Sequence, residues 1–281
     1  MSKNRAASIR ARLKRRADIA KQDFNLTLTQ YGLERLLYRL SISEHQQNFL
    51  LKGALLFVYW YDIPHRPTRD ADLLGFGPND IGALEDVFRN LCAIAVDDGI
   101  EFDAQSVEGV RIRKEAGYGG VRIGMTAKLD GAHVDLQIDV GFGDAVTPGP
   151  ESITYPTMLD DMQAPNLRAY PKYTVVAEKF QAVCALGMSN SRMKDYFDLW
   201  VLLRDDDLDW GILRDAIDAT LARRQTLLMG SVPTGLTDDF AADTGKQTQW
   251  RAFLNKNKLE PVQFIDVVRL LRQAFQKIDV I

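Results

Sequence analysis

Two carboxylates, Asp70 and Asp72, stand one residue apart at the start of an apolar run that ends at Phe76. Side chains alternate between the two faces of a β-strand, so both carboxylates share one face if this run is a strand. Like charges held this close repel each other unless a cation lies between them, and oxygen-only ligands suit Mg2+ or Mn2+. The spacing therefore predicts a divalent-metal site, with a solvated pair of surface acids as the alternative.

A small-residue turn, Gly53-Ala54, opens an apolar helical pattern upstream of the two carboxylates. Glycine leaves the backbone N–H groups accessible, and the first N–H groups of a helix attract phosphate. The turn and the carboxylate pair are together the parts of a metal-dependent site for a nucleoside triphosphate. Lys52 and Arg69 flank these parts, as phosphate-binding bases or as ordinary surface bases.

A second acidic row is expected on the strand 133–140, where Asp135, Gln137 and Asp139 share one face and the apolar residues share the other. The preceding Asp130-Gly131 is typical of a tight hairpin turn, so this strand returns to the sheet. Its acidic side chains can then lie on the same face of the sheet as Asp70 and Asp72. A third carboxylate for the metal site is therefore Asp139 or Asp135, with hairpin-surface acids as the alternative.

Several segments, in order along the chain, resemble motifs of the AbiEii/AbiGii type IV toxin family, nucleotidyltransferase-fold toxins of toxin–antitoxin and abortive-infection systems. The segments are the helix core at residues 31–40, LLKGALLF, RPTRDADLLGFG, IDVGFGDAV, AEKFQAV and RMKDYFDLW. The resemblance runs from about residue 8 to about residue 205. It implies an α/β (α+β) fold, in which a mixed sheet flanked by helices is followed by a helical C-terminal half.

The resemblance also implies roles for side chains that the pattern alone leaves on the surface. It implies a functional lysine at Lys179 and a functional aspartate at Asp195, and it favours Asp139 as the third metal ligand. Asp195 and Asp198 lie on one helical face, where like charges need a partner, and Lys179 is the candidate. The expected catalytic residues are Asp70, Asp72, Lys179 and Asp195; the nucleotide-binding residues are Lys52, Gly53, Ala54, Thr68, Arg69 and Asp198; and the metal ligands are Asp70, Asp72 and Asp139. Ala54 stands where the broader fold prefers Gly or Ser, so it lacks a hydroxyl for the triphosphate.

The function that the resemblance implies is a toxin that transfers NMP units from an NTP to RNA, at the tRNA 3′ acceptor end, and so inhibits translation and growth. A cognate antitoxin encoded nearby and a role in phage defence follow from the same resemblance. Two alternatives stay open: a nucleotidyltransferase with a small-molecule acceptor, and a non-catalytic nucleotide-binding module. A glycosyltransferase is less favoured, because its Asp-x-Asp lacks the upstream glycine turn.

The elements that must position these residues follow from periodicity and turn signals. Helices are predicted at 8–22, 27–41, 46–61, 81–95, 174–188, 192–204, 209–226 and 260–277, and strands at 71–76, 102–113, 121–129 and 133–140. Thr27 or Thr29 is the expected N-cap of the second helix and Asp80 that of the fourth. Residues 229–248 are expected to be a mobile loop. We place an α/β domain at 1–150 and a helical domain at 151–281.

Composition narrows the class of protein. Of the 281 residues, 46% are apolar and 26% are charged, which is ordinary for a soluble protein. The two cysteines and three histidines lack metal-ligand spacing. We find neither an apolar run long enough for a membrane span nor a secretory signal, so we expect a cytoplasmic protein. The net charge is −3, yet residues 1–24 alone are strongly basic, which predicts either an RNA-binding arm or a docked helix with a solvated face.

Overall fold

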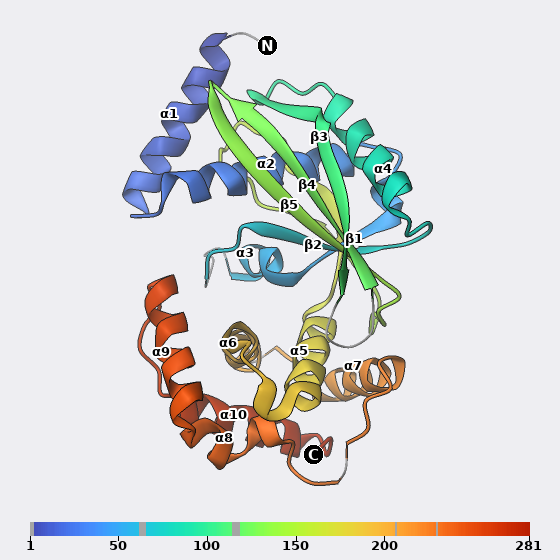
Figure 1. Cartoon of the computed structure of the whole chain (residues 1–281), viewed down its shortest axis with the longest axis vertical. Coiled ribbons are helices and arrows are strands. Elements are labelled where there is room, and N and C mark those ends of the chain that lie inside the picture. Colours follow the sequence, from blue (N-terminus) through green and yellow to red (C-terminus); the bar gives the residue numbers. More distant parts are fainter. Residues whose placement is uncertain (1–2, 62–65, 114–118, 206, 229) are drawn as a thin grey trace. The chain divides into compact units, whose positions relative to one another are not determined.

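The computed structural model describes residues 3–61, 66–113, 119–205, 207–228 and 230–281, and its chain forms two compact units (Figure 1). The first unit comprises Met1–Gly143 and Glu151–Ala169, and it is called the sheet unit below. The second comprises Asp144–Pro150 and Tyr170–Ile281, and it is called the helical unit. Residues 151–169, which the sequence places with the helical domain, belong to the sheet unit and contain two of its strands.

The sheet unit is built on a seven-stranded mixed sheet with the strand order β3-β4-β5-β2-β1-β7-β6. Its elements are α1 (Lys3–Ile19), α2 (Phe24–Ser41), η1 (Gln46–Asn48), β1 (Phe49–Lys52), η2 (Gly53–Leu55), α3 (Leu56–Tyr61), β2 (Asp70–Gly75), α4 (Ile81–Ala93), β3 (Ile100–Arg113), β4 (Gly119–Leu129), β5 (Ala132–Phe142), β6 (Glu151–Thr154) and β7 (Asn166–Ala169). The β2–β5 and β1–β7 pairs are parallel and the other pairs are antiparallel. The predicted α/β class is confirmed.

Helix α2 covers the apolar face of the central strands. Its leucines recur at helical spacing and line, together with Leu73 of β2 and Ile138 of β5, a small apolar cavity. Gly32 allows this close packing, because a Cβ there would lie 2.9 Å from a methyl carbon of Leu136. Since successive strand residues point to opposite faces, the neighbours of Leu73 and Ile138 point away from α2. Asp72 and Asp139 are therefore presented on the opposite face of the sheet.

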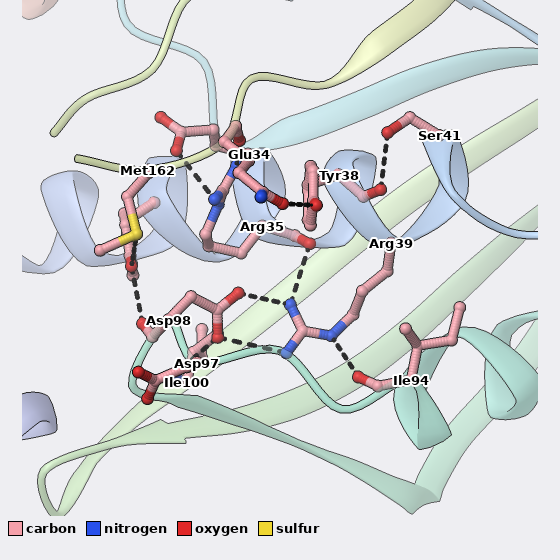
Figure 2. Close-up of polar contacts among 12 residues, drawn as sticks. Glu34, Arg35, Tyr38, Arg39, Ser41, Ile94, Asp97, Asp98, Ile100 and Met162 are labelled. Atoms are coloured by element: carbon pink, nitrogen blue, oxygen red, sulfur yellow. Dashed lines mark hydrogen bonds and ion pairs between the residues drawn. The ribbon is translucent and has the colours of Figure 1, made fainter. Parts of the chain in front are cut away.

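A buried polar network fixes α2 to the loops around it (Figure 2). Arg39 forms a bidentate pair with Asp98, with Nη1–Oδ2 at 2.6 Å and Nη2–Oδ1 at 3.2 Å. Arg35 donates to the carbonyl oxygen of Gln163 at 2.7 Å, and Glu34 accepts from a backbone N–H at 2.6 Å. Burial raises the pKa of Glu34 to about 7. The motif at residues 31–40 thus stabilises the sheet unit by bonding α2 to the surrounding loops.

Helix α1 packs on the sheet unit through apolar contacts and through ion pairs. Ile9 and Leu13 are fully buried, and they form the apolar stripe of this helix. Several of its bases form ion pairs with acids of the same unit: Arg5 and Arg12 with Asp161, Arg5 with Asp97, Arg10 with Asp130, and Lys14 with Asp18 within the helix. These contacts favour the docked-helix interpretation of the basic segment.

The helical unit has an aromatic core. Its elements are α5 (Lys172–Leu186), η3 (Gly187–Ser189), α6 (Met193–Leu202), α7 (Trp210–Arg223), η4 (Thr234–Leu236), α8 (Asp238–Ala242), α9 (Thr244–Asn257) and α10 (Phe264–Lys277). Phe180 packs on Phe275 with ring centroids 4.2 Å apart, and Trp250 packs on Phe264 at 5.0 Å. These rings hold α5, α9 and α10 around one core.

Three sequence predictions are wrong. The helix predicted at 46–61 is largely replaced by strand β1 and a 3-10 turn, because the all-round apolar run is a central strand buried on both faces. The loop predicted at 229–248 contains η4, α8 and the first turn of α9, and it buries Phe240. The N-cap of α2 is Asp23, whose carboxylate accepts from the N–H of Leu26 at 2.9 Å.

The other predicted elements are confirmed, with ends shifted by a few residues. Asp80 caps α4 by accepting from the N–H of Ala83 at 2.8 Å. Asp130 and Gly131 form the tight turn between β4 and β5, both with positive φ as such turns require. Within the described ranges, no helix combines the length and apolarity needed to cross a membrane.

Candidate active site

A row of four charged residues crosses the sheet at the middle of β2. The strand register places Asp72 of β2 opposite Lys52 of β1 on one side and opposite Asp139 of β5 on the other. Asp139 in turn lies opposite Arg122 of β4. Residues opposite one another in a sheet share a face, so Arg122, Asp139, Asp72 and Lys52 form one charged row. Asp70 lies on the same face, two residues before Asp72.

The glycine turn lies directly against this row. Gly53 has a φ of +75°, and a Cβ built on it would lie 2.3 Å from Oδ2 of Asp72. Only a residue without a side chain permits both the backbone angle and the approach of the carboxylate. Ala54 follows within η2 and is half-buried. The structure therefore places the predicted turn against one of the two predicted carboxylates, although a strand and not a helix precedes the turn.

Asp70 is oriented by its own chain neighbour. The hydroxyl of Thr68 donates to Oδ1 of Asp70 at 2.6 Å, and Thr68 is buried. This bond fixes one carboxylate oxygen. Arg69, between the two, instead points toward the start of α2, where its Nη2 lies 3.7 Å from Asp23 and 68% of its side chain is exposed. The structure thus brings Thr68 to the carboxylates and pairs Arg69 with a different acid.

Asp139 is held by an arginine that sequence reasoning missed. Arg122 forms a bidentate pair with Asp139, with Nε–Oδ1 at 2.8 Å and Nη2–Oδ2 at 2.9 Å. The hydrogen bond to Asp139, and then the charges of Asp70 and Asp72, raise the pKa of the Arg122 guanidinium despite partial burial. Asp135 lies opposite Thr126 of β4, but β2 begins only opposite Gln137. Asp135 therefore has no neighbour on β2 and does not lie beside Asp70 and Asp72. The register therefore favours Asp139 over Asp135 as the third carboxylate.

The donor set of this face fits an oxygen-preferring divalent ion only in part. Asp70 and Asp72 offer carboxylate oxygens on one face of a strand, as Mg2+ requires. Among the residues that the structure describes, however, no three His, Cys, Asp or Glu side chains are grouped as a metal cage. Asp139, the expected third ligand, has both carboxylate oxygens engaged by Arg122. Asp70 and Asp72 thus suit the ion by their chemistry and by their position on one face, whereas Asp139 is held by Arg122.

The helical unit contains the second predicted cluster. Nζ of Lys179 on α5 lies 2.9 Å from Oδ1 of Asp195 and 2.7 Å from Oδ2 of Asp198, both on α6. Both aspartates are almost fully buried. Burial alone would raise the pKa of Asp195, but the attraction of Lys179 and Arg192 outweighs it and lowers that pKa. The prediction that the two aspartates share Lys179 as their partner is confirmed.

A second ion network in the helical unit was missed by sequence reasoning. Nη2 of Arg224 lies 3.0 Å from Oδ1 of Asp144 and 3.1 Å from Oε1 of Glu178. Asp144 ends the segment IDVGFGD and Glu178 precedes Lys179, so two of the family-like motifs meet at one arginine. Thr174 of α5 completes the link, because its hydroxyl is bonded to the N–H and the carbonyl of Thr147. The network anchors residues 144–150 on the helix that bears Lys179.

The mixed sheet, the strand–glycine turn–helix connection and the two carboxylates of β2 together define the class: a nucleotidyltransferase. The comparison with known families agrees and is more specific. Residues 35–277 match the model of the AbiEii nucleotidyl transferase toxin of type IV toxin–antitoxin systems. The chain belongs to this family.

Solved structures resemble the chain at low sequence identity. JHP933 from Helicobacter pylori has 14% identity and a TM-score of 0.51, and the match covers 90% of this chain and 91% of that one. A second H. pylori protein, provisionally described as a nucleotidyltransferase, has 14% identity and a TM-score of 0.48, with 89% and 92% of the chains covered. At this identity the JHP933 match supports the fold alone. No curated protein matches the chain in sequence.

Proposed function

We propose that this protein transfers a nucleoside monophosphate from an NTP to RNA, at the 3′ acceptor end of tRNA, and thereby inhibits translation and growth. The carboxylates of β2 against the Gly53 turn, in a chain that belongs to a nucleotidyltransferase toxin family, support the proposal most directly. The family also implies a cognate antitoxin. Phage defence, a cytoplasmic location and dependence on Mg2+ or Mn2+ are part of the same proposal.

The reaction is a substitution at phosphorus. The 3′ hydroxyl oxygen of the acceptor attacks the α-phosphorus of the NTP and forms a new O–P bond. The bond from that phosphorus to the bridging oxygen of the β-phosphate breaks, and pyrophosphate leaves. The hydroxyl proton passes to a carboxylate or to water. A divalent ion, when bound, lowers the pKa of the attacking hydroxyl and neutralises charge on the leaving phosphates.

Residues of the sheet unit have roles in this proposal that follow from their positions. Asp70 and Asp72 hold the ion, and Thr68 fixes the carboxylate of Asp70. The N–H groups after Gly53 are the proposed cradle for the triphosphate, because glycine leaves the backbone open to it. Lys52, Ala54 and Arg69 are the further proposed nucleotide-binding residues.

Residues of the helical unit supply positive charge. Lys179 is proposed to stabilise the leaving pyrophosphate, for which a compact ammonium is suited. Asp195 and Asp198 hold that ammonium in one place through contacts of 2.9 and 2.7 Å.

The test is to incubate the protein with total RNA, Mg2+ and each α-labelled NTP in turn, and to separate the labelled products. We expect one RNA size class, that of tRNA, to be labelled, and Asp70→Asn and Asp72→Asn to label nothing. Glu108→Gln, a surface change outside the charged row, is the matched control and should label normally. The absence of any labelled RNA, with label instead on a small molecule, would refute RNA as the acceptor. The absence of any transfer at all would indicate a nucleotide-binding module.

A further inference from the structure

Arg122 is the residue of the charged row to which the proposed function gives no role. Its Nε and Nη2 donate to the two carboxylate oxygens of Asp139 at 2.8 and 2.9 Å. With its amide oxygen turned toward the guanidinium, Gln137 accepts from the same two nitrogens at 3.2 and 3.3 Å. Among the residues that the structure describes, none accepts a hydrogen bond from Nη1, and 41% of the Arg122 side chain is exposed. The N–H groups of Nη1 are therefore available to a ligand.

The place of Arg122 in the row indicates which part of a substrate it meets. Neighbouring strands lie about 4.8 Å apart, so the backbone of Arg122 lies about 10 Å from that of Asp72 and about 14 Å from that of Lys52. Lys52 precedes the Gly53 turn, which is the proposed cradle for the triphosphate. The attacking and leaving oxygens of a phosphoryl transfer lie roughly in line, on opposite sides of the phosphorus. The acceptor is therefore expected at the Arg122 end of the row.

The sheet surface beyond Arg122 is apolar and exposed. Val110 of β3 lies opposite Arg122 in the register, so the two side chains share a face. Although it is a large apolar residue, Val110 is 46% exposed. The end of the row thus offers a cation and, one strand further out, an apolar contact. A nucleotide has the matching parts, which are an anionic phosphate and the flat face of a base.

The charge of this face explains why an acceptor strand needs a cation there. Three carboxylates, those of Asp70, Asp72 and Asp139, share the face and repel any phosphate that approaches it. A guanidinium beyond the third carboxylate offsets this repulsion, and arginine is well suited to phosphate. Because Asp139 and Gln137 already hold the guanidinium, Arg122 loses little side-chain freedom when a phosphate binds.

We propose that Arg122 binds, through Nη1, a backbone phosphate of the acceptor strand close to its reacting 3′ hydroxyl, with the adjoining nucleotide lying over Val110. This inference rests on the proposed function, which names RNA as the acceptor but assigns no residue to it. The contact favours a polynucleotide over a small alcohol as the acceptor, because only the polynucleotide supplies the phosphate.

The experiment measures binding of 5′-fluorescein-labelled total tRNA by fluorescence anisotropy, without NTP and over a range of salt concentrations. Arg122→Gln should weaken binding by about fivefold and reduce the slope of log K against log salt by about 0.7, the share of one phosphate on a single strand. Binding of each NTP, measured by equilibrium dialysis, should be unchanged. The matched control is Arg111→Gln, which removes an exposed arginine from the opposite face of β3 and should leave both kinds of binding as in the wild type.

A double variant separates a phosphate contact from a structural ion pair. In Arg122→Gln/Asp139→Asn neither residue leaves an unpaired charge, so a merely structural pair predicts that tRNA binding recovers. We expect it to stay as weak as in Arg122→Gln, with melting temperatures as the measure of folding. Recovery in the double variant, wild-type affinity in Arg122→Gln, weaker NTP binding in that variant, an equal loss in Arg111→Gln, or no tRNA binding by the wild type would each overturn the inference.

Transfer assays distinguish this inference from the proposed function. Arg122→Gln should raise the KM for RNA and leave the KM for NTP unchanged. A wild-type protein that labels tRNA, with the KM for RNA unaffected by Arg122→Gln, would support the proposed function and overturn the inference. A protein that binds tRNA through Arg122 yet transfers no label would refute the proposed function and leave the inference standing.

Discussion

Replacing Lys179 with methionine should destabilise the helical unit, and the structure gives the size of the effect. The change keeps most of the side-chain volume but leaves Asp195 and Asp198, which are 0% exposed, without the ammonium 2.9 and 2.7 Å away. Removing one partner of a buried ion pair costs about 3–5 kcal/mol, because the remaining charge stays buried. We expect the free energy of unfolding to fall by about that amount at neutral pH.

The loss should depend on pH with a definite sign. The pKa of Asp195 in the folded protein lies below its ordinary value, so its pairing stabilises the protein above that ordinary value and the stabilisation is lost as the pH falls. In Lys179→Met the two aspartates lose the attraction of the ammonium, which should favour their protonation. The difference in stability between wild type and variant should therefore shrink as the pH falls from about 7 toward about 4.

The assay is urea unfolding followed by circular dichroism at several pH values, with Arg192→Gln as the matched control. Arg192 contacts the same Asp195 at 2.6 Å, but 43% of its side chain is exposed, so its removal should cost no more than about 1 kcal/mol. In Lys179→Met/Asp198→Asn part of the lost stability should return, since one buried charge is removed. A loss below about 1 kcal/mol in Lys179→Met, or a loss that grows as the pH falls, would refute the reasoning.

Gly53→Ala should lower the melting temperature and abolish NMP transfer, because its Cβ would lie 2.3 Å from Oδ2 of Asp72; normal labelling of RNA by this variant would contradict the close approach. Asp70→Ala and Asp72→Ala should each abolish transfer without unfolding, and should raise the melting temperature of the metal-free protein slightly by relieving repulsion, as differential scanning fluorimetry can measure. A drop of several degrees in either variant would instead indicate a structural role for that carboxylate. Arg12→Gln should leave RNA affinity and its salt dependence unchanged, because Arg12 is paired with Asp161; a weaker salt dependence in filter binding would restore the RNA-binding arm.

Much of the sheet unit could be predicted from local patterns. The Asp130-Gly131 turn determines the register of β4 and β5, and the alternation of their residues determines which face each side chain takes. Counting outward from that turn also reaches Arg122 opposite Asp139, so this arginine was accessible to sequence reasoning and was overlooked. The position of Asp139 opposite Asp72 could not be predicted in this way, because β2 and β5 are far apart in the sequence and no local turn determines how they pair.

The errors have a common physical cause, which is that tertiary burial outweighs local preference. Residues 49–51 are all apolar because they belong to a central strand between β2 and β7, buried on both faces, and not because they are helical. The segment at 229–248 is rich in Gly, Thr and Asp, yet Thr237 and Asp243 are N-caps of α8 and α9. Capping residues and loop residues have the same composition, and only the burial of Phe240 between them distinguishes the two cases.

The order in which the two units occur along the chain bears on its synthesis. The polypeptide passes from the sheet unit to the helical unit after Gly143, returns at Glu151, and passes over again after Ala169. The ion pair between Asp144 and Arg224 cannot form until Arg224 has been synthesised, 80 residues after Asp144. A nascent chain that stops before Arg224 leaves the carboxylates of Asp144 and Glu178 without this partner. Premature termination or proteolysis anywhere up to that point should therefore release an incompletely folded fragment and not a smaller toxin.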